Sequence, residues 1–249
     1  MDDPLNVFLW LIFPYICLTI FILGHIWRYR YDKFGWTSRS SQMYESSILR
    51  WANPMFHFGI LAVFLGHVMG LGIPQAWTDA VGISEGMYHF MAISVGAIAG
   101  VFTIVGFIGL LYRRRFTKAV LGATTKMDKT MYFTLGLVIV AGLANTVSGV
   151  AGAYNYREGV SIWFRSIFYF NPQPDLMVDA PFTFQFHALI AIFLFALWPF
   201  TRLVHVFTAP VGYIFRPYVL YRSRDAHAGS RDVRRGWEKV DTIPKRRPD

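Results

Sequence analysis

The sequence predicts an all-α integral membrane protein with five transmembrane helices. Hydrophobic residues make up 54% of the 249 residues and charged residues only 16%, whereas soluble domains carry about 25% charged residues. Five apolar stretches reach the roughly 20 residues that a helix needs to cross a bilayer. Only helices and closed barrels span lipid, and these stretches are far too long for barrel strands.

The five predicted spans are Leu5–Trp27, Ile48–Ile73, Met87–Tyr112, Thr130–Ala153 and Phe182–Phe207. The first is too long for a signal peptide, and it has neither a basic segment before it nor a small-residue cleavage site after it. Between the last two spans, the segment WFRSIFYF (163–170) is expected to form either a short amphipathic helix on the outer surface or an ordinary loop.

Basic residues set the expected orientation of the chain. All but two of the 24 Lys and Arg residues fall in the stretches 28–50, 113–129 and 202–249, which lie on one side of the membrane. The exceptions are Arg157 and Arg165. Positive charge collects on the cytoplasmic side, so we expect the N-terminus outside and the C-terminus in the cytoplasm. The net charge of +9 then reflects topology and contact with anionic lipid, and we expect no nucleic-acid binding.

The chain is expected to form one membrane domain, residues 1–221, followed by a basic cytoplasmic tail, residues 222–249. The tail is rich in Arg and Asp and poor in apolar residues. It cannot bury enough apolar surface to fold alone. We therefore expect it to be either disordered or ordered by a cytoplasmic partner.

Two predicted spans each carry two histidines, His57 and His67 in the second and His187 and His205 in the fifth. Ionisable side chains inside a bilayer are expensive and usually functional. Because the two spans run in opposite directions, depth pairs His67 with His187 near the outer face and His57 with His205 near the inner face. On a continuous helix, His187 and His205 would lie about five turns apart on one face. His57 and His67 are closer together along their span than His187 and His205. For both pairs to face each other, either the helices must be tilted or the bound groups must lie obliquely to the membrane.

Facing imidazoles at two depths suit two haem groups, each with its iron ligated from both sides. One imidazole nitrogen binds the metal while the other donates a hydrogen bond, and an iron with two axial imidazoles transfers electrons rather than binding oxygen. Cys17 is the only cysteine, so covalent attachment is excluded and the haems would be b-type. For each histidine the alternative is an interhelical hydrogen bond. Glycines beside the histidines allow close approach of either a macrocycle or a neighbouring helix; they are Gly59, Gly66 and Gly70.

Three further histidines are weaker ligand candidates. His25 has no second histidine on its span and lies at the inner interface. His89 begins the third span at the outer face, and His227 lies in the tail. The sequence assigns no role to any of them.

Several sequence runs around the four histidines form a recognisable pattern. The most specific is FHALIAIFLFALWPFTRLVHVFTAPVGYIFRPY (186–218), accompanied by FHFGILAVFLGHVMG (56–70) and SSQM (40–43). RYRY (28–31) and YRRRF (112–116) agree more loosely. In these runs the chain resembles the gamma subunit of membrane-bound respiratory nitrate reductase, a five-helix di-haem cytochrome b. The resemblance covers about Leu5 to Arg224.

The resemblance implies two haem b groups, one held by His57 and His205 and the other by His67 and His187. It implies that quinol, either menaquinol or ubiquinol, is oxidised at the outer face. Electrons would then pass to an iron–sulfur beta subunit and to a molybdenum alpha subunit that reduces nitrate in the cytoplasm. The expected location is a bacterial or archaeal-type cell membrane, crossed several times.

By the same resemblance, the quinol site would lie at the outer haem, between the second and third spans. Some family members have a lysine near the start of the third span. This chain has none, and Tyr88 and His89 occupy that neighbourhood. An imidazole, with an ordinary pKa of about 6.5, is suited to accept a quinol proton; the alternative is that His89 caps a helix end. The candidates for quinol contact are Gly66, Met69, Gly70, Met87, Tyr88 and His89.

Haem propionates are anionic and favour charged or hydroxyl donors. On the inner side the candidate partners are Tyr29, Arg50, Arg113, Arg114 and Arg202. Arg202 is favoured because it lies three residues before His205. For each arginine the alternative is ordinary positive charge at a cytoplasmic helix end.

Other functions stay open from the residues alone. A subunit of another menaquinol-linked complex, such as one associated with sulfite reduction, would share all four histidines. Formate dehydrogenase and hydrogenase cytochromes fit less well, because their usual architecture has four helices. A haem-free transporter or scaffold is the alternative from a different class, and the near absence of intramembrane carboxylates and of a broken-helix repeat argues against it.

Overall fold

The computed structural model describes residues 3–150, 154–208 and 215. The chain divides into two units, Met1–Ala209 and Pro210–Asp249. Every helix described below belongs to the first unit. The expected cytoplasmic tail, residues 222–249, lies outside the described residues.

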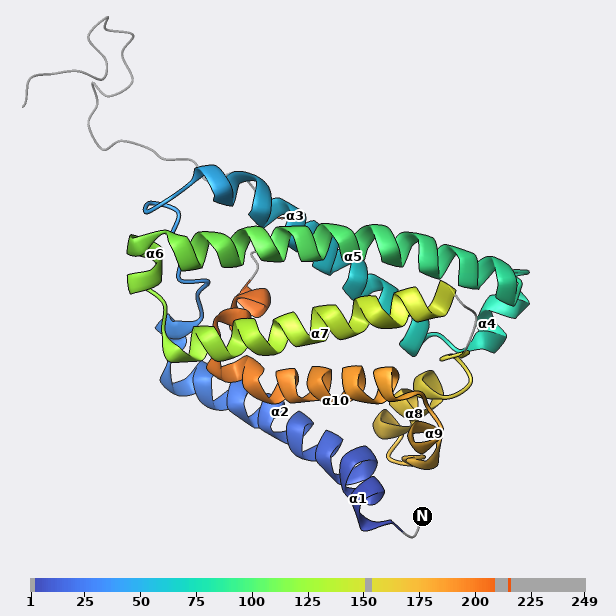
Figure 1. Cartoon of the computed structure of the whole chain (residues 1–249). Coiled ribbons are helices and arrows are strands. Elements are labelled where there is room, and N and C mark those ends of the chain that lie inside the picture. The colour runs from blue at the N-terminus through green and yellow to red at the C-terminus, as the bar shows by residue number, and fades with distance from the viewer. Residues whose placement is uncertain (1–2, 151–153, 209–214, 216–249) are drawn as a thin grey trace, which may run out of the picture. The chain divides into compact units, whose positions relative to one another are not determined.

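Five helices in the described residues are long and apolar enough to cross a membrane, which confirms the predicted fold class (Figure 1). The spans are Pro4–Tyr31, Ser47–Gly72, Glu85–Phe116, Lys126–Gly149 and Phe182–Phe200. Their main helices are α2 (Phe13–Tyr31), α3 (Ser47–His67), α5 (Glu85–Phe116), α7 (Lys126–Val150) and α10 (Phe182–Leu197). The first four spans agree with the predicted ones to within about one helical turn.

Local sequence signals explain where α5 begins and ends. The Ser84 hydroxyl accepts a hydrogen bond from the Met87 N–H at 3.3 Å, which caps the start of the helix. Glu85 occupies the first turn, and three arginines, Arg113 to Arg115, occupy the last. This charge distribution complements the helix dipole.

The tightest packing is between α3 and α5. A Cβ added to Gly106 would come within 2.3 Å of the Phe56 backbone nitrogen, and one added to Gly59 within 2.6 Å of the Thr103 backbone nitrogen. These two glycines therefore bring the two helices into backbone contact. Next to this pair, α7 packs on α5 and on α10, and α10 packs on α2.

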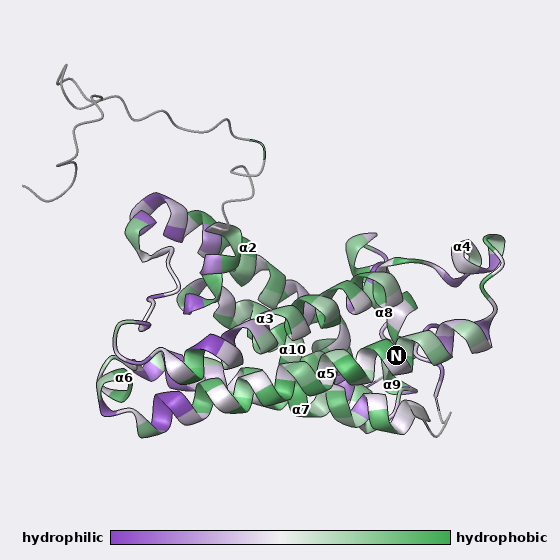
Figure 2. Cartoon of the chain, turned by 90° about the horizontal axis from the view of Figure 1, so that it is seen from above, coloured by the Kyte–Doolittle hydropathy of each residue, from purple (hydrophilic) through white to green (hydrophobic). Residues whose placement is uncertain are grey.

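The surface pattern agrees with a membrane environment. Apolar residues cover the middle of the long helices, and polar residues gather at their ends, around α6 (Lys118–Gly122) among others (Figure 2). Large side chains such as Phe58, Phe64 and Phe90 are exposed on this apolar surface. In lipid such exposure carries no hydrophobic penalty.

Two π-helical segments lie within spans, η1 (Phe8–Ile12) in the first and η3 (Val68–Gly72) at the end of the second. The elements between the spans include η2 (Lys33–Gly35), α4 (Gln75–Ala80), α8 (Val160–Phe168) and α9 (Asp175–Val178). The segment that was expected to be a surface helix or a loop falls largely on α8. Trp163 of this helix is fully buried, donates from Nε1 to the Trp10 carbonyl at 2.9 Å, and meets the Trp10 ring edge-on. Ile167 is buried with it, whereas Ile162 and Phe168 are exposed, so one face of α8 packs on the protein. The interpretation as an amphipathic helix is confirmed, and the interpretation as an ordinary loop is wrong.

The fifth span is not one continuous α-helix. After α10 ends at Leu197, a 3-10 turn (η4, Trp198–Phe200) leads to an extended Thr201, with φ −111° and ψ 177°. A second 3-10 segment follows (η5, Arg202–Thr208). The break contains Pro199, which has no N–H to continue the helical ladder and whose ring obstructs the preceding turn.

This break corrects one expectation. His187 lies on α10 and His205 on η5, so their positions are not those of two residues five turns apart on one α-helix. The chain changes direction between them at Thr201. Neither helix tilt nor obliquely bound groups are therefore needed to explain how the more widely spaced His187 and His205 face His67 and His57.

Candidate functional site

Each histidine of the second span faces one of the fifth span. The ring centroids of His67 and His187 are 6.0 Å apart, and those of His57 and His205 are 6.1 Å apart. Ten residues separate His57 from His67, which corresponds to about 15 Å along α3. Among the described helices, α3 packs mainly on α5, while α10 packs on α7 and α2. The facing rings therefore bridge helices that are not close packing partners.

Three of the four imidazoles are held by a backbone carbonyl that accepts from Nδ1. These bonds, at 2.6 to 2.8 Å, join His57 to Asn53, His67 to Val63, and His205 to Arg202. A carbonyl oxygen only accepts, so Nδ1 carries the hydrogen and the lone pair of a neutral ring is at Nε2. Such a ring is oriented to ligate a metal through Nε2.

His187 is held differently. Its Nδ1 is buried and makes no well-formed hydrogen bond among the described residues, although the ring interacts with the backbone of Val138 on α7. A Cβ added to Gly142 of α7 would come within 3.0 Å of the His187 Cε1 atom. Packing against α7 therefore sets the orientation of this ring, and Gly142 was not among the residues singled out from the sequence.

The separation of the facing rings matches the distance expected when two imidazoles ligate one metal ion. A metal bonded at about 2 Å to a nitrogen of each ring, with each centroid about 1.1 Å beyond its nitrogen, places the centroids about 6.2 Å apart. The separations of 6.0 and 6.1 Å are close to this value. A Cβ added to Gly66, next to His67, would meet nothing within 4 Å. The described residues contain no cluster of three or more His, Cys, Asp or Glu that could hold a metal ion, but a porphyrin needs only two axial ligands from the protein.

The three glycines near the histidines separate into two kinds. Gly59 is in backbone contact with α5, and a Cβ added to Gly70 would come within 2.8 Å of the Tyr156 hydroxyl. These two positions serve close packing between protein groups. Gly66 alone adjoins open space, so the macrocycle interpretation is retained only for this glycine.

The quinol candidates lie around η3 and the start of α5. Met69 and Met87 are exposed. The Tyr88 and Tyr156 hydroxyl groups lie 3.2 Å apart. Burial raises the pKa of Tyr156, and the hydrogen bond with Tyr88 adds to this effect.

Arg157 holds Tyr88 in place. Its guanidinium carbon lies 3.8 Å from the centre of the Tyr88 ring, a cation–π contact. The same group forms an ion pair with Glu85 at 2.9 Å and donates to the Thr78 hydroxyl at 2.7 Å. The arginine is buried, so α4, the start of α5 and the loop before α8 are joined by one charged group.

His89 lies at a helix end, as its alternative interpretation held. Its Nε2 is 3.1 Å from the carbonyl oxygen of Gly149, close to the C-terminal end of α7. Nε2 therefore donates, and the lone pair of a neutral ring is at Nδ1. The capping role leaves one nitrogen able to accept a proton.

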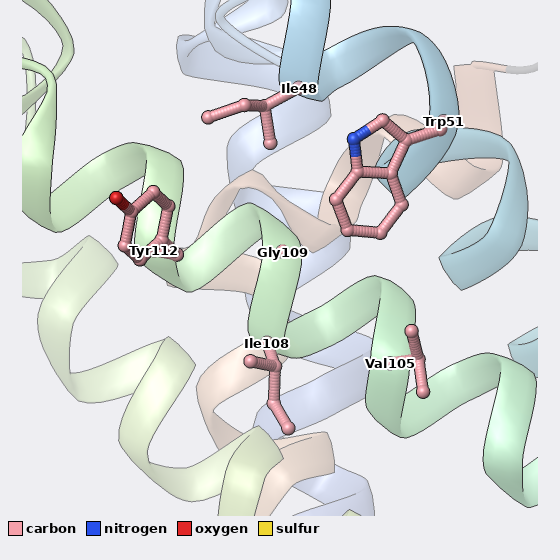
Figure 3. A pocket seen from close by; sticks show the side chains of 6 residues that line it. All are labelled: Ile48, Trp51, Val105, Ile108, Gly109 and Tyr112. Atoms are coloured by element: carbon pink, nitrogen blue, oxygen red, sulfur yellow. The ribbon is translucent and has the colours of Figure 1, made fainter.

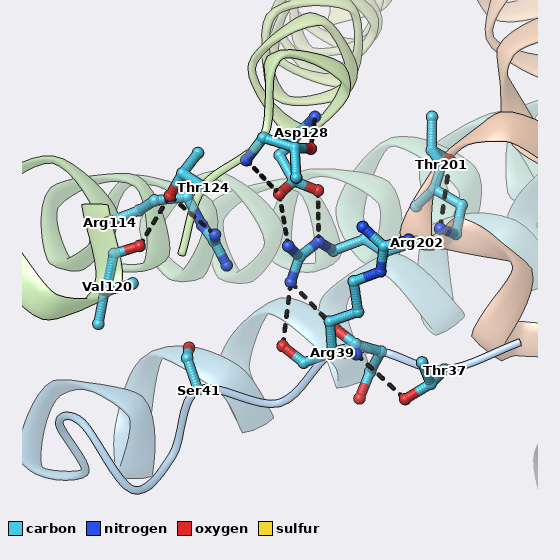
Figure 4. A network of polar contacts seen from close by, with 12 residues as sticks. Thr37, Arg39, Ser41, Arg114, Val120, Thr124, Asp128, Thr201 and Arg202 are labelled. Carbon is cyan, nitrogen blue, oxygen red and sulfur yellow. Dashed lines mark hydrogen bonds and ion pairs between the residues drawn. The ribbon is translucent and has the colours of Figure 1, made fainter. Parts of the chain in front are cut away.

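Arg202, the favoured propionate candidate, is engaged with a carboxylate of the chain itself. Nε and Nη2 donate to the two Asp128 oxygens at 2.8 and 2.6 Å, as Figure 4 shows. Nη1 donates to the carbonyls of Ser38 and Arg39. The paired geometry is the strong form of an arginine–carboxylate contact. Arg202 thus ties η5 to α7 and to the loop after η2.

Arg113 is engaged in the same way. It donates from Nε to a Glu45 carboxylate oxygen at 2.6 Å and from Nη1 to the Ser41 hydroxyl at 2.9 Å. Its Nη2 donates to the backbone carbonyls of Ser41 and Glu45, both at 2.7 Å. This buried arginine secures the loop before α3. Propionate binding by Arg113 and Arg202 stays a prediction, and the contacts seen give both a role within the fold.

The other propionate candidates have fewer partners in the chain. Arg114 donates to the Thr124 hydroxyl at 3.1 Å and lies over the Tyr132 ring. Arg50 and Tyr29 are exposed. Their assignment as propionate partners stays a prediction.

Glu45 should make stability depend on pH at this end of the bundle. A hydrogen bond from the Ser47 hydroxyl, one from the Ile48 N–H and the Arg113 ion pair lower its pKa from 4.5 to about 2. A depressed pKa means that the carboxylate stabilises the fold above pH 4.5 and loses this effect as the pH falls toward about 2. In detergent, Glu45→Gln should therefore unfold at a lower temperature than the wild type at neutral pH, and the difference should shrink across this window.

A matched control for this prediction is Asp79→Asn, which removes an exposed carboxylate outside the spans. It should leave the unfolding temperature close to that of the wild type. An unfolding difference for Glu45→Gln that stays constant down to pH 2 would contradict the proposed contribution of the charged form.

An apolar hollow of about 410 Å³ lies away from the histidines. Figure 3 shows it between the start of α3 and the second half of α5, with lining residues Ile48, Trp51, Val105, Ile108, Gly109 and Tyr112. None of them is a candidate site residue, and the lining is apolar. We assign the hollow to the lipid-facing surface.

His25 is surrounded by aromatic rings rather than by another histidine. Its ring centroid lies 4.4 Å from that of Phe21, 4.9 Å from that of Phe207 and 5.8 Å from that of Trp36. Its Nδ1 donates to the Phe21 carbonyl at 2.6 Å. This environment differs from that of the four facing histidines.

Five membrane-length helices and two pairs of facing imidazoles in the described part of the chain define a polytopic membrane protein with histidines paired at two levels. The chain belongs to the nitrate reductase gamma subunit family, whose model matches residues 6–224. The resemblance expected from the sequence runs is thereby confirmed.

Individual relatives agree with this family. The chain is 57% identical over 238 residues to the nitrate reductase-like protein NarX of Mycobacterium tuberculosis, covering 94% of this chain but 36% of that protein. It is 45% identical to the nitrate reductase gamma chain of Bacillus subtilis, covering 87% of this chain and 97% of the relative. It is 37% identical to the respiratory nitrate reductase 2 gamma chain of Escherichia coli, covering 90% and 100%. The chain thus spans about a third of the Mycobacterium protein and nearly all of the other two.

Proposed function

We propose that the chain is the membrane cytochrome b subunit of a quinol:nitrate oxidoreductase. It oxidises quinol at the outer face and delivers electrons to a cytoplasmic iron–sulfur subunit, which passes them to a molybdenum subunit that reduces nitrate. The proposal is based on the two pairs of facing imidazoles. Their ring centroids are 6.0 and 6.1 Å apart, and they lie on helices that are not close packing partners. Family membership favours nitrate over the sulfite-linked alternative.

His67 and His187 would hold the outer haem b, and His57 and His205 the inner one. When bound, the two haems supply a path for single electrons across the membrane. The carbonyl bonds at Nδ1 orient three of these rings toward their partners, and packing against Gly142 orients His187. The surrounding apolar helices exclude water from the path.

The outer-face residues would handle quinol and its protons. His89 is suited to accept a proton at Nδ1, because its Nε2 hydrogen is committed to the Gly149 carbonyl. Tyr88, the preceding residue, is held by Arg157 and carries a hydroxyl that lies 3.2 Å from that of Tyr156. The remaining contacts would come from Gly66, Met69, Gly70 and Met87. We place the N-terminus outside and the C-terminus in the cytoplasm, where residues 222–249 would meet the partner subunits.

The proposal is tested in membranes that contain the complete complex. A reduced menaquinol analogue should reduce the b haems, seen as a reduced-minus-oxidised visible difference spectrum, and nitrate should then re-oxidise them. Re-oxidation by sulfite but not by nitrate would contradict the proposed terminal acceptor. Failure of any quinol to reduce the haems would contradict the proposed donor.

A further inference from the structure

Arg28 is buried at the last turn of α2, with 6% of its surface exposed. Its Nη1 donates to the carbonyl oxygens of Pro199 and Thr201, the latter at 3.2 Å, and its Nη2 donates to the Gly35 carbonyl at 2.9 Å. Nε lies 3.3 Å from an Asp32 carboxylate oxygen. One guanidinium therefore joins the end of the first span to the break in the fifth.

The two carbonyls of the fifth span that Arg28 holds are located where the helix is interrupted. The last carbonyls of a helix have no partner in their own ladder and must find one elsewhere. A charged donor makes a stronger hydrogen bond than a neutral one. Gly24 permits the approach of α2, since a Cβ there would come within 2.8 Å of the Pro199 side chain.

The same break leads directly to His205. The Thr201 hydroxyl accepts from the Leu203 N–H at 3.2 Å, which caps the start of η5. His205 then donates from Nδ1 to the Arg202 carbonyl at 2.6 Å. The His205 ring therefore follows closely after the Thr201 carbonyl that Arg28 holds. The residues from 202 to 205 that connect them belong to the 3-10 segment η5 and contain no α-helical turn. On the other side of η5, the Asp128 ion pair of Arg202 completes the support.

We propose that Arg28 is a positioning residue for His205: by holding the Pro199 and Thr201 carbonyls, it fixes the break that turns this imidazole toward His57. The proposal rests on the proposed function, because it concerns the geometry of the inner haem site. His187, on α10 before the break, faces His67 without help from this guanidinium. Loss of Arg28 should therefore affect one haem site and spare the other.

The test compares Arg28→Gln with Arg30→Gln in the purified full-length chain. Arg30 lies two residues away on the same helix and is exposed, so the control removes the same charge from the same helix end. The measurements are haem stoichiometry and the low-spin ferric signals in electron paramagnetic resonance, which report the mutual orientation of axial imidazoles. Arg28→Gln should lose at least half of the inner haem or shift its signal, with the outer signal unchanged. Arg30→Gln should match the wild type.

The outer haem serves as an internal control for folding. If Arg28→Gln does not accumulate, Arg28→Lys provides the second variant: a single ammonium cannot hold three carbonyls in the same fork, so the inner signal alone should shift. Equal loss of both haems would overturn the proposal in favour of a general structural role. Two unchanged signals would also overturn it, while leaving the proposed function intact. A wild-type chain without haem would instead contradict the proposed function.

Discussion

Replacing His205 with leucine should lower the haem content from two per chain to one and abolish quinol-linked nitrate reduction. Leucine fills much of the volume of imidazole but offers no lone pair, so the inner iron loses one of its two axial ligands. His67 and His187 are unaffected, because their 6.0 Å facing geometry involves α3 and α10 only. The remaining haem should still be reduced by quinol but should no longer be re-oxidised by nitrate.

The matched control is His25→Phe, which removes another histidine of the membrane segments but keeps a ring against Phe21 and Phe207. It should retain both haems and nitrate-linked turnover. The reciprocal variant His187→Leu should lose the outer haem and, with it, reduction by quinol. Nitrate-linked turnover at the wild-type rate in His205→Leu would contradict the proposed order of electron transfer.

The second large effect is expected at Gly106, where α3 and α5 touch. An alanine Cβ would come within 2.3 Å of the Phe56 nitrogen and 2.7 Å of its Cα, and both are backbone atoms that cannot rotate away. Overpacking of this kind costs typically about 1–3 kcal/mol. Because α3 carries His57 and His67, its displacement should weaken both haem sites together. Gly106→Ala should therefore show a lower unfolding temperature in detergent and reduced occupancy of both haems.

Gly96→Ala provides the control on the same helix. A Cβ there would meet nothing within 4 Å, and alanine is the better helix former by about 1 kcal/mol. This variant should be as stable as the wild type or more so. If Gly106→Ala were equally stable and kept both haems, backbone contact at this glycine would not be what positions α3.

The spans could be predicted from the sequence because length and hydropathy decide whether a helix crosses a membrane. The partners within each histidine pair could be predicted because depth in antiparallel helices depends only on residue spacing and direction. The shape of the fifth span could not. Pro199 lies in an apolar run, and prolines are tolerated inside membrane helices when neighbouring groups satisfy the freed carbonyls. Here the neighbouring group is Arg28, which is 171 positions away.

The same reason explains the arginines. Sequence position makes Arg113 and Arg202 equally good partners for a propionate and for a distant carboxylate. Their acidic partners, Glu45 and Asp128, are 68 and 74 positions away, and no local pattern pairs residues at such separations. Gly142 could not be identified for a related reason, since only the packing of α7 on α10 shows that its missing side chain makes room for His187.

The most direct test is the haem content of the purified wild-type chain, measured by a pyridine haemochrome spectrum against protein concentration. Two b-type haems per chain, each low-spin and bis-histidine by electron paramagnetic resonance, is the predicted result. A colourless protein, with the His57–His205 and His67–His187 rings in contact through hydrogen bonds alone, would contradict the account.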